Sequence, residues 1–461
     1  MDLLCRVVED DDALEPHFAR GSTLLPSGMT SISSSDDSAD ESADDSSDDS
    51  SDESAEKSAE ESSDDSSDDV MNAEPGARMH VRMRQSHARK KRMAMIAIGE
   101  LIQACPVLLE SQMSRCAAAL CGMMSCVQPA IRRCALETLT RICTFLPEPA
   151  VAITAAILEL QHGEEDGAKC AALLLLRTLL LSSKESGRPE ELFSTSLPIA
   201  IRSATDVLSI AAEEEEITSI QAECVEAACE LIGAVGTVVG ERFEEAFRSL
   251  AAPLLRYVQR GPTETRAAAI GCFAEVLSAF PERLRAPYAD VLLRPPHIPT
   301  MLTNSSAIVR SNAAFCVAAC AMSPAASACV DALTALISRS TSSAEDTTAR
   351  ENAAAALAAL ISSGRAPPAR AADSARCAPV AVPSDNAIIY GCLTSLLDAR
   401  NRSADVAIIV SSCARALSCP HVDSDTKRKI STSIASLKRE FASSIASLPL
   451  SPSERIAVDS V

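Results

Sequence analysis

Residues 224–260 read CVEAACELIGAVGTVVGERFEEAFRSLAAPLLRYVQR, and residues 263–293 read TETRAAAIGCFAEVLSAFPERLRAPYADVLL. In each stretch an Ala-rich amphipathic segment is followed by a break, marked by Gly240 or Pro281, and then by a second amphipathic segment. Apolar residues at helical spacing predict a helix on both sides of each break. Such a helix pair cannot bury its own apolar face, so its repetition at intervals of about 40 residues predicts a stack of pairs instead of a globular enzyme.

The same unit recurs from about Arg89 to the C-terminus. First helices are expected to begin near Arg89, Pro129, Gly167, Ile217, Thr263, Ala307, Asp346, Asp385 and Asp425. Second helices are expected near Val107, Glu148, Pro189, Glu241, Glu282 and Pro324. The steps of about 35 to 50 residues are typical of HEAT-type repeats. We therefore predict an all-α, right-handed α-solenoid of about eight to nine HEAT-type helix pairs over 78–461, with a weaker repeat around 365–383, where four prolines leave little room for helix.

The composition agrees with a helical array. The 461 residues are 47% hydrophobic but contain no Trp and only 3 Tyr, so the core is built from small side chains. Ala and Leu, which are frequent, are strong helix formers. The apolar run 171–181 is too short and too closely flanked by Lys and Arg to span a bilayer. No membrane insertion is expected.

The 18 cysteines follow helical spacings, as in Cys116 with Cys121 and Cys224 with Cys229. We interpret them as small buried apolar residues in a reducing compartment, not as a disulfide framework. The group Cys413, Cys419 and His421 lacks the spacing and the fourth ligand of a zinc site. No metal or other cofactor is expected.

The net charge of −21 is concentrated near the N-terminus. Asp36–Asp69 contains seventeen acidic residues and one Lys, which leaves about −5 for the remainder of the chain. The segment repeats two acids and two small residues and has no large apolar side chain, so it is expected to be disordered. The predicted organisation is a partial helix and irregular segment over 1–35, a disordered acidic Ser/Asp-rich tract over 36–77, and the solenoid. The nearly balanced solenoid gives no indication of direct nucleic-acid binding.

Arg78–Arg92 contains seven basic residues. One interpretation is a nuclear-localisation or nucleic-acid patch. The simpler interpretation, which we prefer, is a solvated first turn of the next helix. The Ser residues of the acidic tract lie next to acids and therefore resemble substrates of acidophilic kinases, and phosphorylation would deepen the negative charge.

Several first helices begin with an Arg followed by an Ala-rich stripe. These positions are Arg132, Arg266, Arg310 and Arg350, with Asn312 and Asn352 two residues after the last two. In a stack, such side chains can bond to acidic or carbonyl groups of the adjacent turn, so we assign them a structural role between repeats.

Catalysis is the least expected class of function. The sequence contains no phosphate-binding loop after a strand and no nucleophile elbow, and its six His are scattered. Gly233, Gly236 and Gly240 occupy a predicted helix and its end, where they permit close packing and a left-handed cap. They do not follow the strand that a dinucleotide fingerprint requires.

Three stretches carry a family resemblance. They are Glu230-Leu-Ile-Gly-Ala-Val-Gly-Thr-Val-Val-Gly-Glu-Arg-Phe with the later Pro253-Leu-Leu, then Ile308-Val-Arg-Ser-Asn-Ala-Ala-Phe, then Ala349-Arg-Glu-Asn-Ala-Ala-Ala-Ala-Leu. Their order resembles the importin-β (karyopherin) superfamily, specifically the C-terminal half of the importin four branch of HEAT-repeat nuclear import receptors. The tail Ser424-Asp-Thr-Lys-Arg-Lys and the place of the acidic tract are also similar to that branch.

The resemblance implies a nuclear transport receptor that shuttles between cytoplasm and nucleus through the nuclear pore. Its implied partners are basic protein cargo, such as ribosomal proteins or histones, and nucleoporin Phe-Gly repeats. A Ran-type GTPase is implied only if N-terminal repeats exist beyond the eight or nine present here, and no residue of a Ran site can be assigned.

Two acidic segments are candidates for cargo binding. One is the run of Glu213, Glu214, Glu215 and Glu216, for which a solvated loop between helices is the alternative. The other is the tract Asp36–Asp69, which could equally be a spacer. Two further functions stay open: a HEAT-repeat scaffold that assembles other proteins, and an acidic histone-chaperone-like protein in which the tract binds the partner.

Overall fold

The computed structural model describes residues 1–9, 75–126, 128–146, 149–162, 166–185, 196–213, 217–401 and 404–461. Every regular element within these ranges is helical. The acidic tract 36–69 lies outside them. The chain divides into two compact units, Asp2–Ala94 and Met95–Val461, the second of which also includes Met1.

The Asp2–Ala94 unit contains α1 (Asp2–Glu9) and the first part of α3 (Pro75–Ala104), which continues into the other unit. The first helix, expected near Arg89, therefore begins earlier, within the segment assigned to the acidic tract. Pro75 suits this start because a proline at the first helical position has its φ angle already set for a helix. The basic residues Arg89, Lys90 and Arg92 lie on exposed positions of α3, whereas Lys91 is buried.

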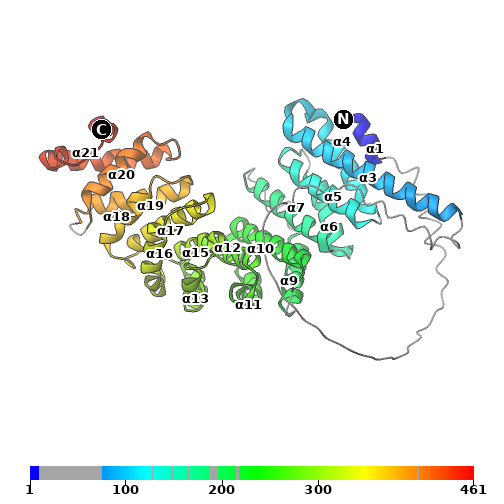
Figure 1. The fold of residues 1–461 in the computed structure, drawn as a ribbon, viewed down its shortest axis with the longest axis horizontal. Helices are drawn as coiled ribbons and strands as arrows, with labels where there is room; N and C mark the ends of the chain where they lie inside the picture. Colours follow the sequence, from blue (N-terminus) through cyan, green and yellow to red (C-terminus); the bar gives the residue numbers. More distant parts are fainter. Residues whose placement is uncertain are drawn as a thin grey trace, which may run out of the picture. The chain divides into compact units, whose positions relative to one another are not determined.

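The Met95–Val461 unit is a succession of helix pairs (Figure 1). The first helices are α5 (Pro129–Ile142), α7 (Asp166–Glu185), α10 (Ser219–Val239), α12 (Thr263–Ala279), α15 (Ala307–Ala319), α17 (Ala344–Ser362), α19 (Pro383–Asp398) and α21 (Ser424–Ala446). The second helices are α4 (Glu110–Gly122), α6 (Pro149–His162), α9 (Leu197–Glu213), α11 (Glu244–Arg260), α13 (Glu282–Leu292), α16 (Val330–Ser338), α18 (Ala371–Cys377), α20 (Val406–Ser418) and α22 (Pro452–Asp459).

These helices form two layers. Each first helix packs against the first helix of the next repeat, from α5 through to α21. Figure 1 shows α9, α11, α13 and α16 following one another along one side of the first helices, in the other layer. From Pro129 onward the first helices begin within about two residues of the predicted positions. The predicted all-α solenoid is confirmed.

Two glycines bring α10 and α12 together. A Cβ atom at Gly236 would lie 2.7 Å from Cγ2 and 3.0 Å from Cα of Val276, so only glycine fits without a shift. A Cβ at Gly233 would meet the Glu275 carboxylate, which is the end of a flexible side chain and can move away, so the constraint is weaker there. Gly240 ends α10 with a φ of 65° and a ψ of −140°, a positive-φ backbone that favours glycine. The sequence predicted both the close packing and this helix end.

The Gly-Glu-Arg-Phe turn at 240–243 also positions an aromatic cluster. Phe243 is buried, and its ring centroid lies 6.0 Å from that of Phe247. Phe247 in turn packs edge-on against Phe273 and Phe280, at 5.7 and 5.8 Å. These large side chains fill the junction of α10, α11 and α12, while small residues form most of the core elsewhere.

The segment 365–383 holds more helix than expected. The prolines flank α18 instead of interrupting it: Pro368 begins a single 3-10 turn, and Pro383 is the first residue of α19. At those positions a missing amide proton and a fixed φ angle do no harm. Inside α18, the buried Ser374 donates a 3.0 Å hydrogen bond to the Ala354 carbonyl of α17. The helix pair persists, with a second helix of 7 residues.

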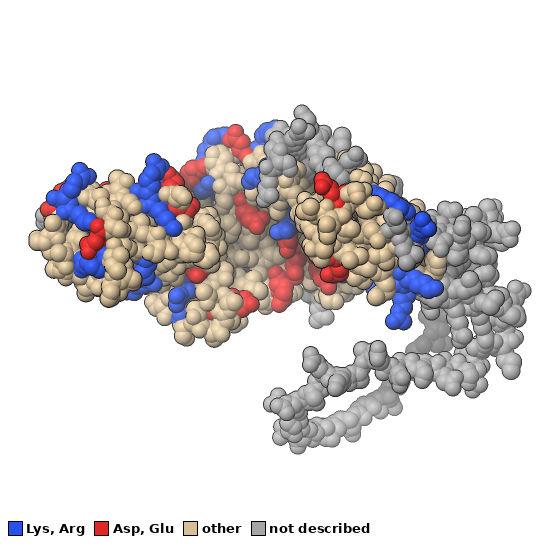
Figure 2. All heavy atoms as spheres, turned by 90° about the horizontal axis from the view of Figure 1, so that it is seen from above, with Lys and Arg blue, Asp and Glu red and all other residues tan. Residues whose placement is uncertain are grey.

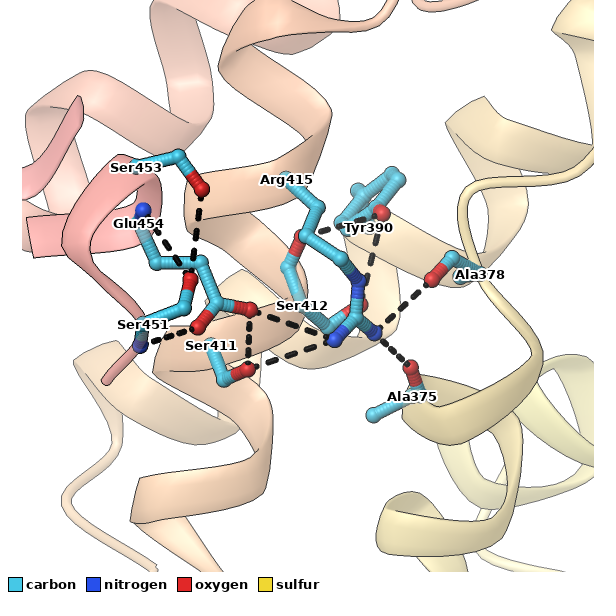
Figure 3. Close-up of polar contacts among 9 residues, drawn as sticks. All are labelled: Ala375, Ala378, Tyr390, Ser411, Ser412, Arg415, Ser451, Ser453 and Glu454. Carbon is cyan, nitrogen blue, oxygen red and sulfur yellow. Dashed lines mark hydrogen bonds and ion pairs between the residues drawn. The ribbon is translucent and has the colours of Figure 1, made fainter. Parts of the chain in front are cut away.

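Polar contacts fix the last helix, α22, against the preceding repeat (Figure 3). Glu454 completes a capping box with Ser451 and accepts a 2.6 Å hydrogen bond from Ser411 of α20. Arg415 of α20 lies 3.3 Å from the same carboxylate, and its other Nη atom donates to the carbonyls of Ala375 and Ala378 at the end of α18. One arginine thus links three helices.

The 18 cysteines, all within the described residues, form no disulfide, and most are buried. Among the described helices, none is long and apolar enough to cross a bilayer.

Candidate acidic binding face

A stripe of glutamates runs along the exposed side of α10. The helix begins at Ser219 because Thr218 and Gln221 form a capping box, with Thr218 Oγ1 accepting from the Gln221 amide at 3.2 Å. From that start, Cys224, Val225 and Ala228 face the core. Three glutamates at intervals of three and four residues, Glu223, Glu226 and Glu230, consequently share the opposite side.

Neighbouring first helices extend this stripe. We use the name acidic face for Glu137 of α5, Glu223, Glu226 and Glu230 of α10, and Glu264 and Glu275 of α12. The face exists because α5, α7, α10 and α12 pack in series and present corresponding sides to solvent. Figure 2 shows Asp and Glu side chains gathered over the middle of the molecule in this view from above.

Two arginines partly compensate these six glutamates. Arg133 of α5 lies 2.8 Å from Glu137 and 3.5 Å from Glu223. Arg177 of α7 lies 3.2 Å from Glu230. All of these side chains are more than one third exposed, so each pair contributes little to stability. An excess of negative charge remains on the face.

The carboxylates raise one another's pKa. Burial raises the pKa of Glu226 above its ordinary value, and the neighbouring charges of Glu264, Glu230 and Glu223 raise it further. Desolvation, with an added contribution from Glu230, also raises the pKa of Glu275, although Arg177 opposes the shift. A cation placed among these groups would relieve their repulsion, so the face is suited to bind positive charge.

The hollow on this face is small. An open hollow of about 190 Å³ lies between α5, α7 and α10, bounded by Arg133, Glu137, Glu223 and Glu226 among others. Small-molecule and cofactor sites usually measure about 300 to 1,000 Å³. The dimensions accommodate a side chain of a protein partner better than a cofactor.

A larger hollow of about 660 Å³ lies between α6, α7, α9 and α10. Its charged lining is mixed, with Lys169 and Arg202 beside Asp166 and Asp206. It shows no excess of one sign that would select a charged ligand.

The Arg and Asn residues that were singled out in the sequence make different kinds of contact in the structure. Arg132 forms a two-pronged contact with the buried Glu159 of α6, at 2.7 and 3.2 Å, and donates to the Cys126 carbonyl at 2.9 Å. It therefore joins the two helices of one repeat. The Nε atoms of Arg266 and Arg350 are buried without a hydrogen-bond partner.

Arg310, Asn312 and Asn352 contact neighbouring repeats. Arg310 of α15 is 2% exposed, donates to the carbonyls of Asn304 and Ser305 at 2.7 and 2.6 Å, and pairs with Asp346 of α17. Asn312 donates to the Ala267 carbonyl of α12 at 2.7 Å. Asn352 of α17 donates to the Ser311 hydroxyl of α15 at 2.9 Å. Asparagines at matching positions thus connect α12, α15 and α17.

The cargo-binding candidates named from the sequence are not the residues of the acidic face. Glu214, Glu215 and Glu216 lie outside the described residues. The side chain of Glu213 also lies outside them, although its backbone forms the last residue of α9. Contact of these four glutamates with cargo therefore stays a prediction.

The acidic face was missed although the spacing of Glu223, Glu226 and Glu230 was visible in the sequence. Its extension to Glu264 and Glu275 depends on helices that pack about 40 residues apart in the chain. Spacing alone does not indicate which sides of those helices meet.

Comparison with known proteins supports the fold. No family model and no curated protein matches the chain. Among solved structures, the karyopherin Kap121p bound to the extreme C-terminus of the protein phosphatase Cdc14p is similar, with a TM-score of 0.53, 15% identity and coverage of 81% of this chain and 35% of that one. Kap121p bound to RanGTP matches with a TM-score of 0.53, 15% identity and coverage of 76% and 35%. Kap121p bound to Nup53p matches with a TM-score of 0.53 and 14% identity, and the match covers 77% of this chain and 36% of that one.

At this identity, the likeness concerns the fold: the chain has a helical-repeat architecture similar to that of the karyopherin Kap121p. It spans about a third of the length of the Kap121p chains that it matches.

Proposed function

We propose that this chain is a cargo-binding portion of a nuclear transport receptor of the importin-β type, and that its acidic face binds Lys- and Arg-rich protein segments. The observation that carries the proposal is the grouping of six glutamates and two arginines on consecutive first helices of a karyopherin-like solenoid. Its function is binding, not catalysis. The cargo class is basic protein, of which ribosomal proteins and histones are examples.

The physical argument rests on many weak contacts. One exposed ion pair contributes up to about 1 kcal/mol, so a single glutamate cannot capture a partner. Several carboxylates spread over α5, α10 and α12 can act together on an extended basic segment. Binding of this kind weakens with added salt, because the Debye length falls to about 10 Å at 0.1 M ionic strength.

Further partners are proposed from the fold. Kap121p has been solved in complexes with RanGTP and with Nup53p. By analogy of fold we propose that the chain binds nucleoporin Phe-Gly repeats and shuttles between cytoplasm and nucleus at the nuclear pore. We propose Ran-type GTPase binding only for a product that carries additional N-terminal repeats. Retention on immobilised Phe-Gly repeats tests this directly, and its absence would favour a scaffold function.

The decisive experiment for the acidic face is a fluorescence titration of a Lys/Arg-rich peptide with the full chain. Replacing Glu223, Glu226 and Glu230 together by Gln should weaken binding by about tenfold, since three pairs of about 0.5 kcal/mol each sum to that factor. The expected loss should shrink at high salt.

A matched control removes the same charge from the other layer of the solenoid. Glu241→Gln, Glu245→Gln and Glu282→Gln together alter exposed positions at and near α11 and α13. This control should bind the peptide within about twofold of the unaltered chain. Equal weakening by both triple variants would indicate attraction by net charge alone and contradict the proposed face.

The acidic run after α9 is a separate proposed contact. Replacing Glu213, Glu214, Glu215 and Glu216 together by Gln tests it in the same titration. Weaker binding that adds to the loss from the acidic face would support a second contact with the peptide, whereas unchanged affinity would leave the run as a solvated loop.

A further inference from the structure

Two cysteines from adjacent repeats meet beside the acidic face. Cys170 lies near the start of α7 and Cys224 near the start of α10, where each side chain contacts the backbone of the other helix. Cys224 Sγ donates to the Asp166 carbonyl of α7 at 3.1 Å, and Cys170 Sγ donates to the Glu223 carbonyl of α10 at 3.5 Å. These reciprocal contacts fix the two side chains across the junction of α7 and α10.

Each thiol of the pair borders a different surface hollow. Cys170 lines the hollow of about 190 Å³ on the acidic face, and Cys224 lines the hollow of about 660 Å³ next to α9. Both residues are mostly buried, at 3% exposure for Cys224 and 6% for Cys170, and each is part of the wall of its hollow. The neighbouring Cys224 side chain lowers the pKa of Cys170, and the thiolate is the reactive form of cysteine.

We propose that Cys170 and Cys224 form a redox-reactive dithiol, which a peroxide oxidises to a disulfide that links two repeats. The Cys170 thiolate attacks one peroxide oxygen, so that an S–O bond forms, the O–O bond breaks and the leaving hydroxide takes a proton to become water. Sulfur of Cys224 then attacks the resulting sulfenic acid: the S–S bond forms, the S–O bond breaks, and the Cys224 proton leaves with the hydroxide as a second water. Each thiol loses one electron, and hydrogen peroxide is reduced to two waters.

A second thiol pair in the same solenoid provides an internal comparison. Cys229 of α10 and Cys272 of α12 also lie next to each other across two repeats. They are 1% and 3% exposed and line neither of the two hollows, and burial raises the pKa of Cys272. Both pairs place two cysteines of adjacent repeats next to each other, whereas only Cys170 and Cys224 border the two hollows and only Cys170 has a lowered pKa.

The experiment follows oxidation of the full chain by mass spectrometry. The reduced chain is exposed to hydrogen peroxide, remaining thiols are alkylated at intervals, and peptides are mapped without reduction. A cross-linked peptide containing Cys170 and Cys224 should appear at least about ten times faster than any containing Cys229 and Cys272. If Cys170 and Cys224 both stay reduced while the exposed Cys105 is oxidised, the proposal is overturned.

Two variants separate the chemistry from effects on folding. In Cys224→Ala, Cys170 should stop at the sulfenic acid and react with a dimedone probe. Cys272→Ala, the matched control, should leave the link between Cys170 and Cys224 unchanged. If circular dichroism shows that Cys224→Ala does not fold, the oxidation time course of the unaltered chain still tests the proposal. These readouts require no cargo, so their failure is distinguishable from failure of the proposed function.

Discussion

At the scale of single residues, Arg310 shows how the repeats are held in register. Its side chain is almost completely buried, and its donors reach two carbonyls of the preceding turn and a carboxylate of the next repeat. A buried charge is tolerated only when it is paired and hydrogen-bonded. The same guanidinium that satisfies Asn304 and Ser305 therefore also joins α15 to α17.

Arg310→Ala should destabilise the fold by about 3 kcal/mol, because it leaves buried acceptors without a donor. A urea unfolding curve followed by circular dichroism measures the change. The control is Arg283→Ala, which removes an exposed ion pair with Glu241 and should cost less than about 1 kcal/mol. Similar shifts for the two variants would show that Arg310 is not a special junction.

Glu226 should make stability depend on pH. Its pKa is higher in the folded chain than the ordinary value of 4.5, so its ionisation opposes folding. The stabilisation that comes from the protonated carboxyl group is fully present at pH values below the ordinary pKa. It is lost as the pH rises through the raised pKa of the folded chain. Glu226→Gln should therefore raise the urea midpoint at about pH 7 and leave it nearly unchanged at about pH 3.5. Glu245→Gln, at an exposed position of α11, is the control for the loss of a surface charge. An equal rise in its urea midpoint at about pH 7 would contradict the expectation.

At the scale of helices, the sequence predicted most of the repeat. Apolar periodicity and breaks such as Gly240 located the first helices closely, since those signals are local. The start of α3 and the helix α18 were not predicted, because proline reads as a breaker unless its place in the helix is known. The acidic face required knowledge of which helix sides meet solvent together, and that depends on tertiary packing between residues such as Glu226 and Glu264.

Close packing of α10 and α12 leads to a prediction at the same scale. Gly236→Ala should destabilise the chain by about 1 to 3 kcal/mol, because the new methyl group would overlap Val276, including its backbone. Gly391→Ala is the matched control within helix α19, where a Cβ atom has nothing within 4 Å. That change should be neutral or stabilise by up to about 1 kcal/mol through helix propensity. Thermal unfolding of both variants tests the difference, and equal destabilisation would rule out the packing explanation.

At the scale of the whole molecule, negative charge occurs in two separate places. One is the acidic face, whose carboxylates are held at fixed positions on packed helices; the other is the tract Asp36–Asp69, which lies outside the described residues. Fixed charges select a partner by the arrangement of its cations, whereas a long polyanion attracts any cation. The two sources of attraction therefore differ in their sensitivity to the partner's sequence.

Removal of 36–69 separates these contributions. If the acidic face binds the cargo, the shortened chain should retain affinity for one Lys/Arg-rich peptide within about threefold at 0.15 M salt, because the carboxylates that contact the peptide are unchanged. Preference for that peptide over a scrambled peptide of equal charge should persist or increase, since the less selective polyanion is absent. Competition titrations with both peptides measure this. Loss of most affinity on shortening would instead identify the tract as the binding element and favour the histone-chaperone-like function.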